Sequence, residues 1–167
     1  VLERPPINKG YGNSTTTSAD VTDRQTAGQV LLALAETVGT RIRADHVQIQ
    51  TVSVGIRYAD MTYVSHQKKL WSSTNLTWEI YQAASRLFAD LWDGSPIRHL
   101  GIHTGSVWEE DFIRQTELFD KTDYGKLAGL DAAVDNIRKR YGMDAVMRAA
   151  FLDQPFGRYE NAKGSSM

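Results

Sequence analysis

The stretch Thr51-Val52-Ser53-Val54-Gly55-Ile56-Arg57-Tyr58 alternates between two kinds of side chain. Its even-numbered residues are large and apolar, and its odd-numbered residues are small, polar or basic. Because successive side chains of a β-strand point to opposite faces, this period of two predicts a strand with one buried face and one open face. We expect the strand to cover residues 47–58, with Thr51, Ser53 and Arg57 on the open face.

Three further segments are predicted strands. Residues 11–18 are rich in Thr, and residues 97–107 again alternate, with Leu100 and Ile102 set against His99 and His103. The dipeptide Ala59-Asp60 allows a tight turn, after which residues 61–70 can pair back onto residues 47–58 as a hairpin.

Two helical segments separate these strands. The first is introduced by the capping box Thr22-Asp23-Arg24-Gln25, in which we expect the Thr22 hydroxyl to cap the helix. Apolar residues then recur at the spacing of three and four that is typical of one buried helix face, and the helix is expected to end near Ala44. The second runs from about Asn75 until Asp93-Gly94-Ser95-Pro96 stops it, with Gly94 as its C′ residue.

The resulting order is β-α-β-β-α-β, which predicts an α+β fold. Each amphipathic helix must bury its apolar stripe, so we expect a four-stranded antiparallel sheet with both helices on one face. The opposite face stays open and is lined by small, polar or basic residues. A further C-terminal helix is predicted from the apolar spacing between Leu127 and Tyr141, with Gly142 as its stop.

Composition limits the classes of function. The chain of 167 residues has no Cys, which excludes disulfides and thiolate metal sites and suits a reducing cytoplasm. No apolar run approaches the roughly 20 residues that cross a bilayer, so no contact with a membrane is expected. The net charge is −1, but the predicted strands at 46–70 and 97–108 carry four basic residues, one acidic residue and all four His. The helical stretches are acidic, so the domain should have two electrically different faces.

A basic and hydroxyl-rich sheet face can bind phosphates. Lys and Arg neutralise them, Ser and Thr hydrogen-bond to their oxygens, and glycines let the strand backbone approach closely. The competing interpretation is the ordinary wet face of a half-exposed sheet, and the pattern alone favours it.

The segment 114–120, Arg-Gln-Thr-Glu-Leu-Phe-Asp, reads as a linear peptide for docking into a groove on a partner. Folding back on the domain, or starting a helix, is an equally good interpretation of its spacing.

No residues suggest catalysis by this chain. His99 and His103 lie on one predicted strand, which separates them by roughly 13 Å, too far to share a metal. The acidic residues are scattered over turns and helix faces and do not predict a site for two-metal nucleotidyl transfer. No phosphate-binding loop and no Ser-His-Asp arrangement is present.

Six stretches, in their order, resemble the little-finger domain of Y-family translesion DNA polymerases of the bacterial DNA polymerase IV type. The resemblance covers residues 8–151, and the order of the stretches carries it more than any single one. The stretches are residues 12–22, 51–60, 64–70, 97–103, 115–120 and 130–142.

The resemblance implies a domain that lays its sheet in the major groove of primer–template DNA and contacts mainly the backbone. It also implies that Gln115, Leu118 and Phe119 bind a bacterial sliding clamp. No cofactor is expected in this fragment; Mg²⁺ belongs to the catalytic core, which would precede Val1 in a polymerase. We expect a monomer in the bacterial cytoplasm. The DNA-binding residues expected are Ser14, Thr15, Thr16, Thr51, Ser53, Arg57, Ser65, His66, Lys68, Arg98 and His103.

This organisation sets the expected boundaries. They are a linker at 1–9, the little-finger domain at 10–108, an acidic linker with the clamp peptide at 109–125, a helical segment at 126–156 and a disordered tail at 157–167.

The sequence also departs from the family. His66, Lys68 and His103 stand where relatives often have Arg or another basic residue, which predicts weaker and more pH-sensitive DNA binding. In the clamp peptide, Thr116 occupies a position where Leu is frequent, which predicts weaker clamp binding.

Two other classes of function remain as alternatives. A ferredoxin-like module for RNA or a small ligand would place exposed aromatic residues on the central strands, whereas Tyr58 is expected on the core face. A dimerisation scaffold would need an apolar open face, which Thr51, Ser53 and Arg57 disfavour.

Overall fold

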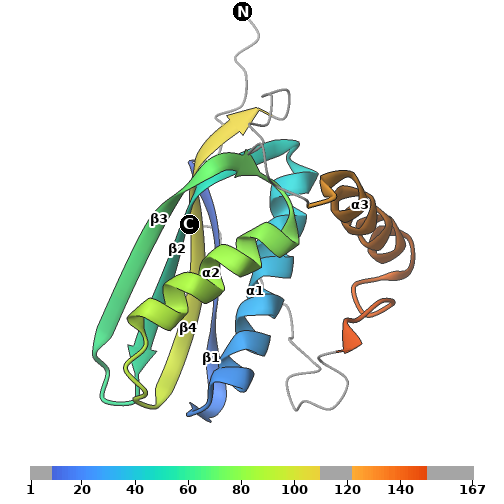
Figure 1. Ribbon diagram of the computed structural model, residues 1–167. Helices are drawn as coiled ribbons and strands as arrows, with labels where there is room; N and C mark the ends of the chain where they lie inside the picture. Colours follow the sequence, from blue (N-terminus) through green and yellow to red (C-terminus); the bar gives the residue numbers. More distant parts are fainter. Residues whose placement is uncertain (1–8, 110–121, 150–167) are drawn as a thin grey trace, which may run out of the picture. The chain divides into compact units, whose positions relative to one another are not determined.

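The computed structural model describes residues 9–109 and 122–149. Its elements follow the predicted order, including the predicted C-terminal helix (Figure 1). They are β1 (Gly10–Val21), α1 (Arg24–Ala44), β2 (Val47–Tyr58), β3 (Tyr63–Thr74), α2 (Thr77–Leu91), β4 (Ile97–Glu109) and α3 (Tyr124–Tyr141).

The four strands form one antiparallel sheet in the order β1-β4-β2-β3. The central strands β2 and β4 pair over most of their length, so that Val54 lies opposite Ile102 and Gly55 opposite Gly101. β1 and β3 form the two edges. The predicted fold class is therefore confirmed.

Both α1 and α2 pack on the same face of this sheet, α1 mainly on β1 and β4, and α2 mainly on β3 and β2 (Figure 1). The core between the layers contains the predicted stripes of both helices and the even-numbered side chains of β2. Ile56, Ile102 and Ile42 have no exposed surface. No helix of the described residues up to Asp131 covers the opposite face of the sheet, which is called the open face below.

The start of α1 corrects one prediction. Asp23, not Thr22, is the N-cap, and its carboxylate accepts a hydrogen bond from the Thr26 backbone nitrogen at 2.7 Å. This bond holds the pKa of the Asp23 carboxyl below its ordinary value. Thr and Asp are both good caps, and the two are adjacent, so the sequence could not decide between them.

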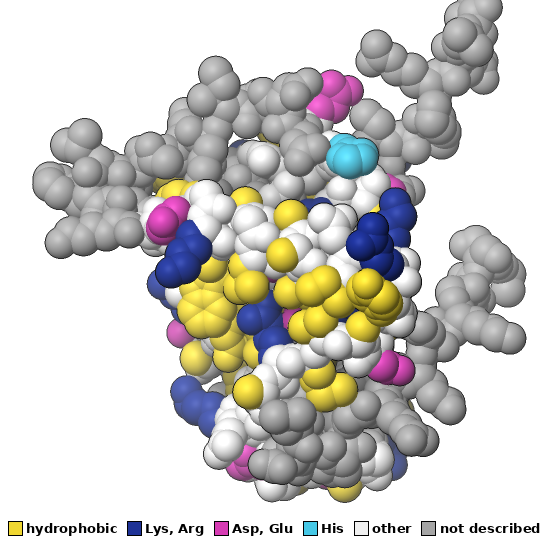
Figure 2. All heavy atoms as spheres, turned by 90° about the vertical axis from the view of Figure 1, so that its right-hand side faces the viewer, with side chains coloured by type: hydrophobic (Ala, Val, Ile, Leu, Met, Phe, Trp, Pro, Cys, Tyr) yellow, Lys and Arg dark blue, Asp and Glu magenta, His cyan; other side chains and the backbone are white. Residues whose placement is uncertain are grey.

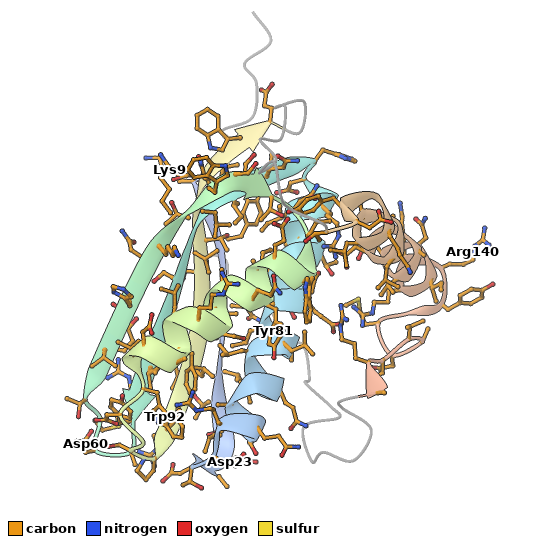
Figure 3. All side chains as sticks on the ribbon, in the orientation of Figure 1. Lys9, Asp23, Asp60, Tyr81, Trp92 and Arg140 are labelled. Atoms are coloured by element: carbon orange, nitrogen blue, oxygen red, sulfur yellow. The ribbon has the colours of Figure 1, made fainter. Side chains whose placement is uncertain are left out.

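The end of α2 also differs slightly. The helix ends at Leu91 with Trp92 as its C-cap, so Gly94 lies in the following turn, not at the C′ position. Its φ of +92° is a conformation that non-glycine residues rarely adopt. Figure 3 shows Trp92 at the same end of the sheet as Asp60, in the β2–β3 turn, with Lys9 at the other end.

The chain divides into two compact units, Val1–Asp131 and Ala132–Met167. Asp131 is the last residue of the first unit, and its carboxylate accepts hydrogen bonds from the Thr77 backbone nitrogen at 3.0 Å and from Arg43 Nη1 at 3.1 Å. The cap residue of α2, Leu76, makes no side-chain cap bond. Asp131 therefore satisfies a backbone donor at the start of α2. In the second unit, the described part contains the end of α3, and Gly142 follows it with a φ of +101°.

Candidate nucleic-acid interface

The open face is built from cross-strand rows of four residues. Residues directly opposite in an antiparallel pair share a face, so the register defines each row. From β1 to β3, the rows are Thr16–His99–Arg57–Tyr63, Ser14–Gly101–Gly55–Ser65, Gly12–His103–Ser53–Gln67 and Gly10–Gly105–Thr51–Lys69. This surface carries hydroxyl, imidazole and cationic groups, with one aromatic ring at a corner.

Seven of the eleven predicted DNA-binding residues gather on this face, and four do not. Thr15, His66 and Lys68 pair with Leu100, Val54 and Val52, whose side chains are in the core, so their side chains point to the helix-covered side. Arg98 is exposed next to the first row, where its Nη1 lies 3.6 Å from the Met61 sulfur. The open-face members are Ser14, Thr16, Thr51, Ser53, Arg57, Ser65 and His103.

The β2–β3 turn explains why His66 and Lys68 were misplaced. A two-residue turn at Ala59-Asp60 would put Met61 opposite Tyr58 and hence Lys68 opposite Thr51. The observed register is shifted by one residue and puts Lys69 there. The longer turn is closed by a bond from the Tyr58 nitrogen to the Thr62 oxygen at 2.9 Å, and Met61 has a φ of 71° within it. A shift of one residue moves every side chain of the strand to the other face.

Three of the five glycines in these rows are covered by side chains of neighbouring strands, so at these three positions the strand backbone is not open in the way that was predicted. A methyl group built on Gly12 would lie 2.3 Å from Nδ1 of His103, and one on Gly55 would lie 2.3 Å from the Tyr63 hydroxyl oxygen. Gly101 is buried, and a methyl group built on it would lie 3.0 Å from Cβ of Ser14. The glycines therefore leave room for side chains from neighbouring strands, a known device of β-sheets.

One corner of the open face contains a cation and an aromatic ring that the sequence analysis did not identify together. The Arg57 guanidinium carbon lies 5.4 Å from the centre of the Tyr63 ring, and its Nη1 donates to the Met61 carbonyl at 3.2 Å. Tyr63 is 54% exposed. The sequence analysis missed Tyr63 because it considered stacking aromatic residues on the central strands only. The aromatic residue there, Tyr58, is buried as predicted.

His99 is the open-face residue whose protonation is most affected by its surroundings. Burial, and secondarily the charge of Arg57, hold the pKa of His99 below its ordinary value. Its Nδ1 is 3.0 Å from the Thr16 hydroxyl oxygen. His99 is therefore neutral at pH 7. Because the folded state binds this proton less well than the unfolded state, the contribution of His99 to stability is complete above pH ~6.5 and declines as the pH falls below that value.

We expect the Arg57→Ala substitution to raise the pKa of His99, because it removes a nearby positive charge. The pKa should still stay below the ordinary value, since burial is the larger cause and remains. NMR titration of the His99 ring nitrogens in both proteins measures this. An unchanged pKa in Arg57→Ala would show that the two side chains are not close in solution.

Other parts of the described structure offer no comparable site. On the side shown in Figure 2, the Lys and Arg side chains in view are scattered among hydrophobic and uncharged ones. Within residues 9–109 and 122–149, no three His, Asp or Glu side chains lie together as a possible metal site. No helix in the described part of the chain is long and apolar enough to cross a membrane. The predicted clamp-binding residues Gln115, Leu118 and Phe119 lie outside the described residues, as do most of the predicted linkers and the predicted tail.

Comparison with known proteins gives a consistent result. The model of the impB/mucB/samB family C-terminal domain matches residues 8–118. DNA polymerase IV of Clostridium acetobutylicum is 34% identical over 146 residues, which are 87% of this chain and 37% of that protein. DNA polymerase IV 2 of Bacillus subtilis is 41% identical over 136 residues, 80% of this chain and 32% of that protein. The chain thus spans about a third of the length of these relatives.

The fold also matches solved structures. The post-insertion binary complex of Dbh DNA polymerase aligns with a TM-score of 0.53 and 14% sequence identity, covering 64% of this chain and 32% of that one. At this identity the likeness supports the sheet-and-helix arrangement and nothing finer.

Proposed function

Since the chain belongs to the impB/mucB/samB C-terminal domain family, the little-finger domain of Y-family DNA polymerase IV, we propose that its open face binds the DNA backbone without reading base sequence. The observation that carries the proposal is the composition of that face. Hydroxyl groups and cations stand on β1, β2 and β3, from Thr16 and Ser14 on β1 to Lys69 on β3, and β4 contributes the imidazoles of His99 and His103 between them. Such groups suit phosphate oxygens.

The width of the sheet supports contact with the backbone in preference to the bases. Four strands span about 14 Å between the outer strand axes, since neighbouring strands are ~4.8 Å apart. The major groove is roughly 12 Å wide and admits a two-stranded ribbon. A four-stranded face therefore lies across the groove and meets phosphates at both of its rims.

We expect the chain to bind two duplexes of equal length and unrelated sequence with the same affinity. A strong preference for one of them would contradict the proposal.

The alternative classes of function gain less support. A dimerisation surface would be apolar at its centre, where this face has Ser53 and His103. An RNA-recognition sheet would carry its aromatic residues on the central strands, where the described β2 and β4 place none in the middle rows. The one aromatic residue among the four rows is at a corner, on an edge strand.

We also propose that the segment around Gln115, Leu118 and Phe119 binds a sliding clamp, on the strength of its sequence and of the family. Two adjacent apolar anchors in an acidic segment suit a hydrophobic groove on a partner. In the Leu118→Ala, Phe119→Ala double variant, we expect clamp affinity to fall by about tenfold or more, because anchor residues carry most of the energy of such interfaces.

The converse substitution is Thr116→Leu, which we expect to raise the affinity for a bacterial sliding clamp, while Arg114→Ala serves as a control at the margin of the peptide. Surface plasmon resonance with the whole chain measures all of these. A double variant that binds the clamp as well as the parent chain would refute the assignment.

Nucleotidyl transfer is proposed for a longer protein of which this chain would be one part. Matched relatives extend well beyond the aligned region, and the whole-protein activity, its Mg²⁺ requirement and its primer–template substrate would belong to such a protein. The domain would hold the DNA beside that catalytic core, in the cytoplasm of a bacterium. We expect the chain by itself to bind DNA and not to extend a primer.

A further inference from the structure

The corner of the open face formed by Tyr63 and Arg57 has a chemistry that duplex backbone binding does not need. Tyr63 presents an aromatic surface that is 54% exposed, and the other side chains of the four rows are hydroxyl, amide, imidazole or cationic. We propose that this corner is a stacking platform for an unpaired nucleotide of the single-stranded template. The inference rests on the proposed function and adds a second kind of DNA contact to it.

The ring of Tyr63 is held in place from two sides. Its hydroxyl end lies over Gly55, where the missing side chain leaves the space that the ring occupies. The Arg57 guanidinium lies 5.4 Å from the ring centre and is itself fixed by its bond to the Met61 carbonyl. An aromatic ring that is already oriented loses little conformational entropy when a base stacks on it, and a neighbouring guanidinium adds attraction for the base and its phosphate.

The position of the ring selects an unpaired nucleotide. Tyr63 is on the edge strand β3, in the last row before the turn, so it lies at the margin of the face and not beneath the centre of a bound duplex. Bases inside a duplex are paired and stacked on each other, and their flat surfaces are inaccessible. A single-stranded extension leaving the duplex at this margin offers a base that can stack.

Met61 completes the corner. Its side chain is 54% exposed in the turn, and its sulfur lies 3.6 Å from Arg98 Nη1. Met61 in the turn and Arg98 on β4 thus add a second apolar group and a second cation to this corner of the sheet. An unpaired nucleotide, which combines an apolar ring with a phosphate, matches this pairing of groups better than an all-ionic ligand does.

The test compares three DNA probes bound to the whole chain and measured by fluorescence anisotropy: a blunt duplex, the same duplex with a short 5′ template extension, and one whose extension is abasic. The abasic extension keeps the phosphates and lacks the bases. We expect the ordinary extension to improve affinity by about five- to 100-fold and the abasic one to do so much less, because stacking on an aromatic side chain has this magnitude.

Three variants locate the effect. Tyr63→Ala should lower the affinity for the extended duplex much more than the affinity for the blunt duplex, whereas Tyr63→Phe should retain the gain from the extension. Gly55→Ala keeps the tyrosine but places a methyl group where the ring lies, and it should also reduce the gain. Circular dichroism confirms that each variant is folded.

The outcomes are separable. Equal loss of affinity for blunt and extended DNA in Tyr63→Ala, or no loss for either, would overturn the stacking platform. A gain that persists with the abasic extension would overturn it too, since phosphates alone would then suffice. If the parent chain binds none of the probes at low salt, the proposed function itself fails.

Discussion

In the Ile102→Ala variant, we expect the free energy of unfolding to fall by about 2–5 kcal/mol. Ile102 has no exposed surface, and it lies on the central strand β4 opposite Val54 of β2, between the sheet and the helices. Removing its buried alkyl groups loses their transfer free energy and leaves a cavity that the packed layers cannot close fully. Urea denaturation followed by circular dichroism measures the change.

Leu130→Ala is the matched control for Ile102→Ala. It also shortens an aliphatic side chain, but Leu130 is 52% exposed, so the expected change is within about 0.5 kcal/mol. Similar effects of the two substitutions would contradict the assignment of the even-numbered face of β4 to the core. They would also remove the basis for assigning its odd-numbered face to the DNA.

The second large effect is expected in the Arg57→Ala, Lys69→Ala double variant, whose affinity for duplex DNA should depend much less on salt. Each phosphate neutralised by a side chain contributes about 0.9 to the slope of log K against log salt concentration. Loss of two cations from the open face should therefore make this negative slope shallower by about two, for every DNA sequence alike. Anisotropy titrations at several salt concentrations give the slope.

The neighbouring lysines provide an internal control. Lys69 lies opposite Thr51 on the open face, and Lys68 lies opposite Val52 on the other side. Lys69→Ala should make the salt slope shallower by about one. Lys68→Ala removes the same charge one residue away and should change the slope much less. If Lys68→Ala has the larger effect, the sequence-based choice of Lys68 was right, and the open face of β3 does not contact the backbone.

The sequence was sufficient to predict the fold because the pattern along β2 and the helices is strong. The alternation from Thr51 to Tyr58 identifies the buried side chains of β2, and the apolar stripe of α1 identifies the buried face of that helix equally well. Once the helices must bury their stripes on a sheet, one face remains open. The residues of that face on the central strands, such as Ser53 and His103, follow directly.

The edge strand β3 was less predictable. Its residues from Ser65 to Lys69 are polar on both faces, so no alternation of burial marks which side chains point where. The register then depends on the β2–β3 turn, whose length is decided by local bonds such as that from the Thr62 nitrogen to the Asp60 carboxylate at 2.9 Å. The sequence suggests a turn of two residues, but the turn in the structure is longer. Lys69 is therefore on the open face, and not Lys68, which the sequence analysis had predicted.

The covering of the glycines could not be predicted either. Whether Gly55 exposes its backbone depends on the side-chain conformation of Tyr63, and for Gly12 it depends on His103, which is 91 residues away in the sequence. These are contacts between strands, and propensity or periodicity carries no information about them. The same limit hid the Tyr63–Arg57 pair, since only the register brings the two residues together.

The most direct test of the central claim is the salt dependence of binding between the whole chain and a fluorescent primer–template duplex. With Arg57, Lys69 and Arg98 neutralising phosphates, log K should fall linearly with log salt concentration, with a slope of about −3, and identically for unrelated sequences. An affinity that is indifferent to salt, or no binding even at low salt, would contradict the account of the open face as a surface that grips the DNA backbone.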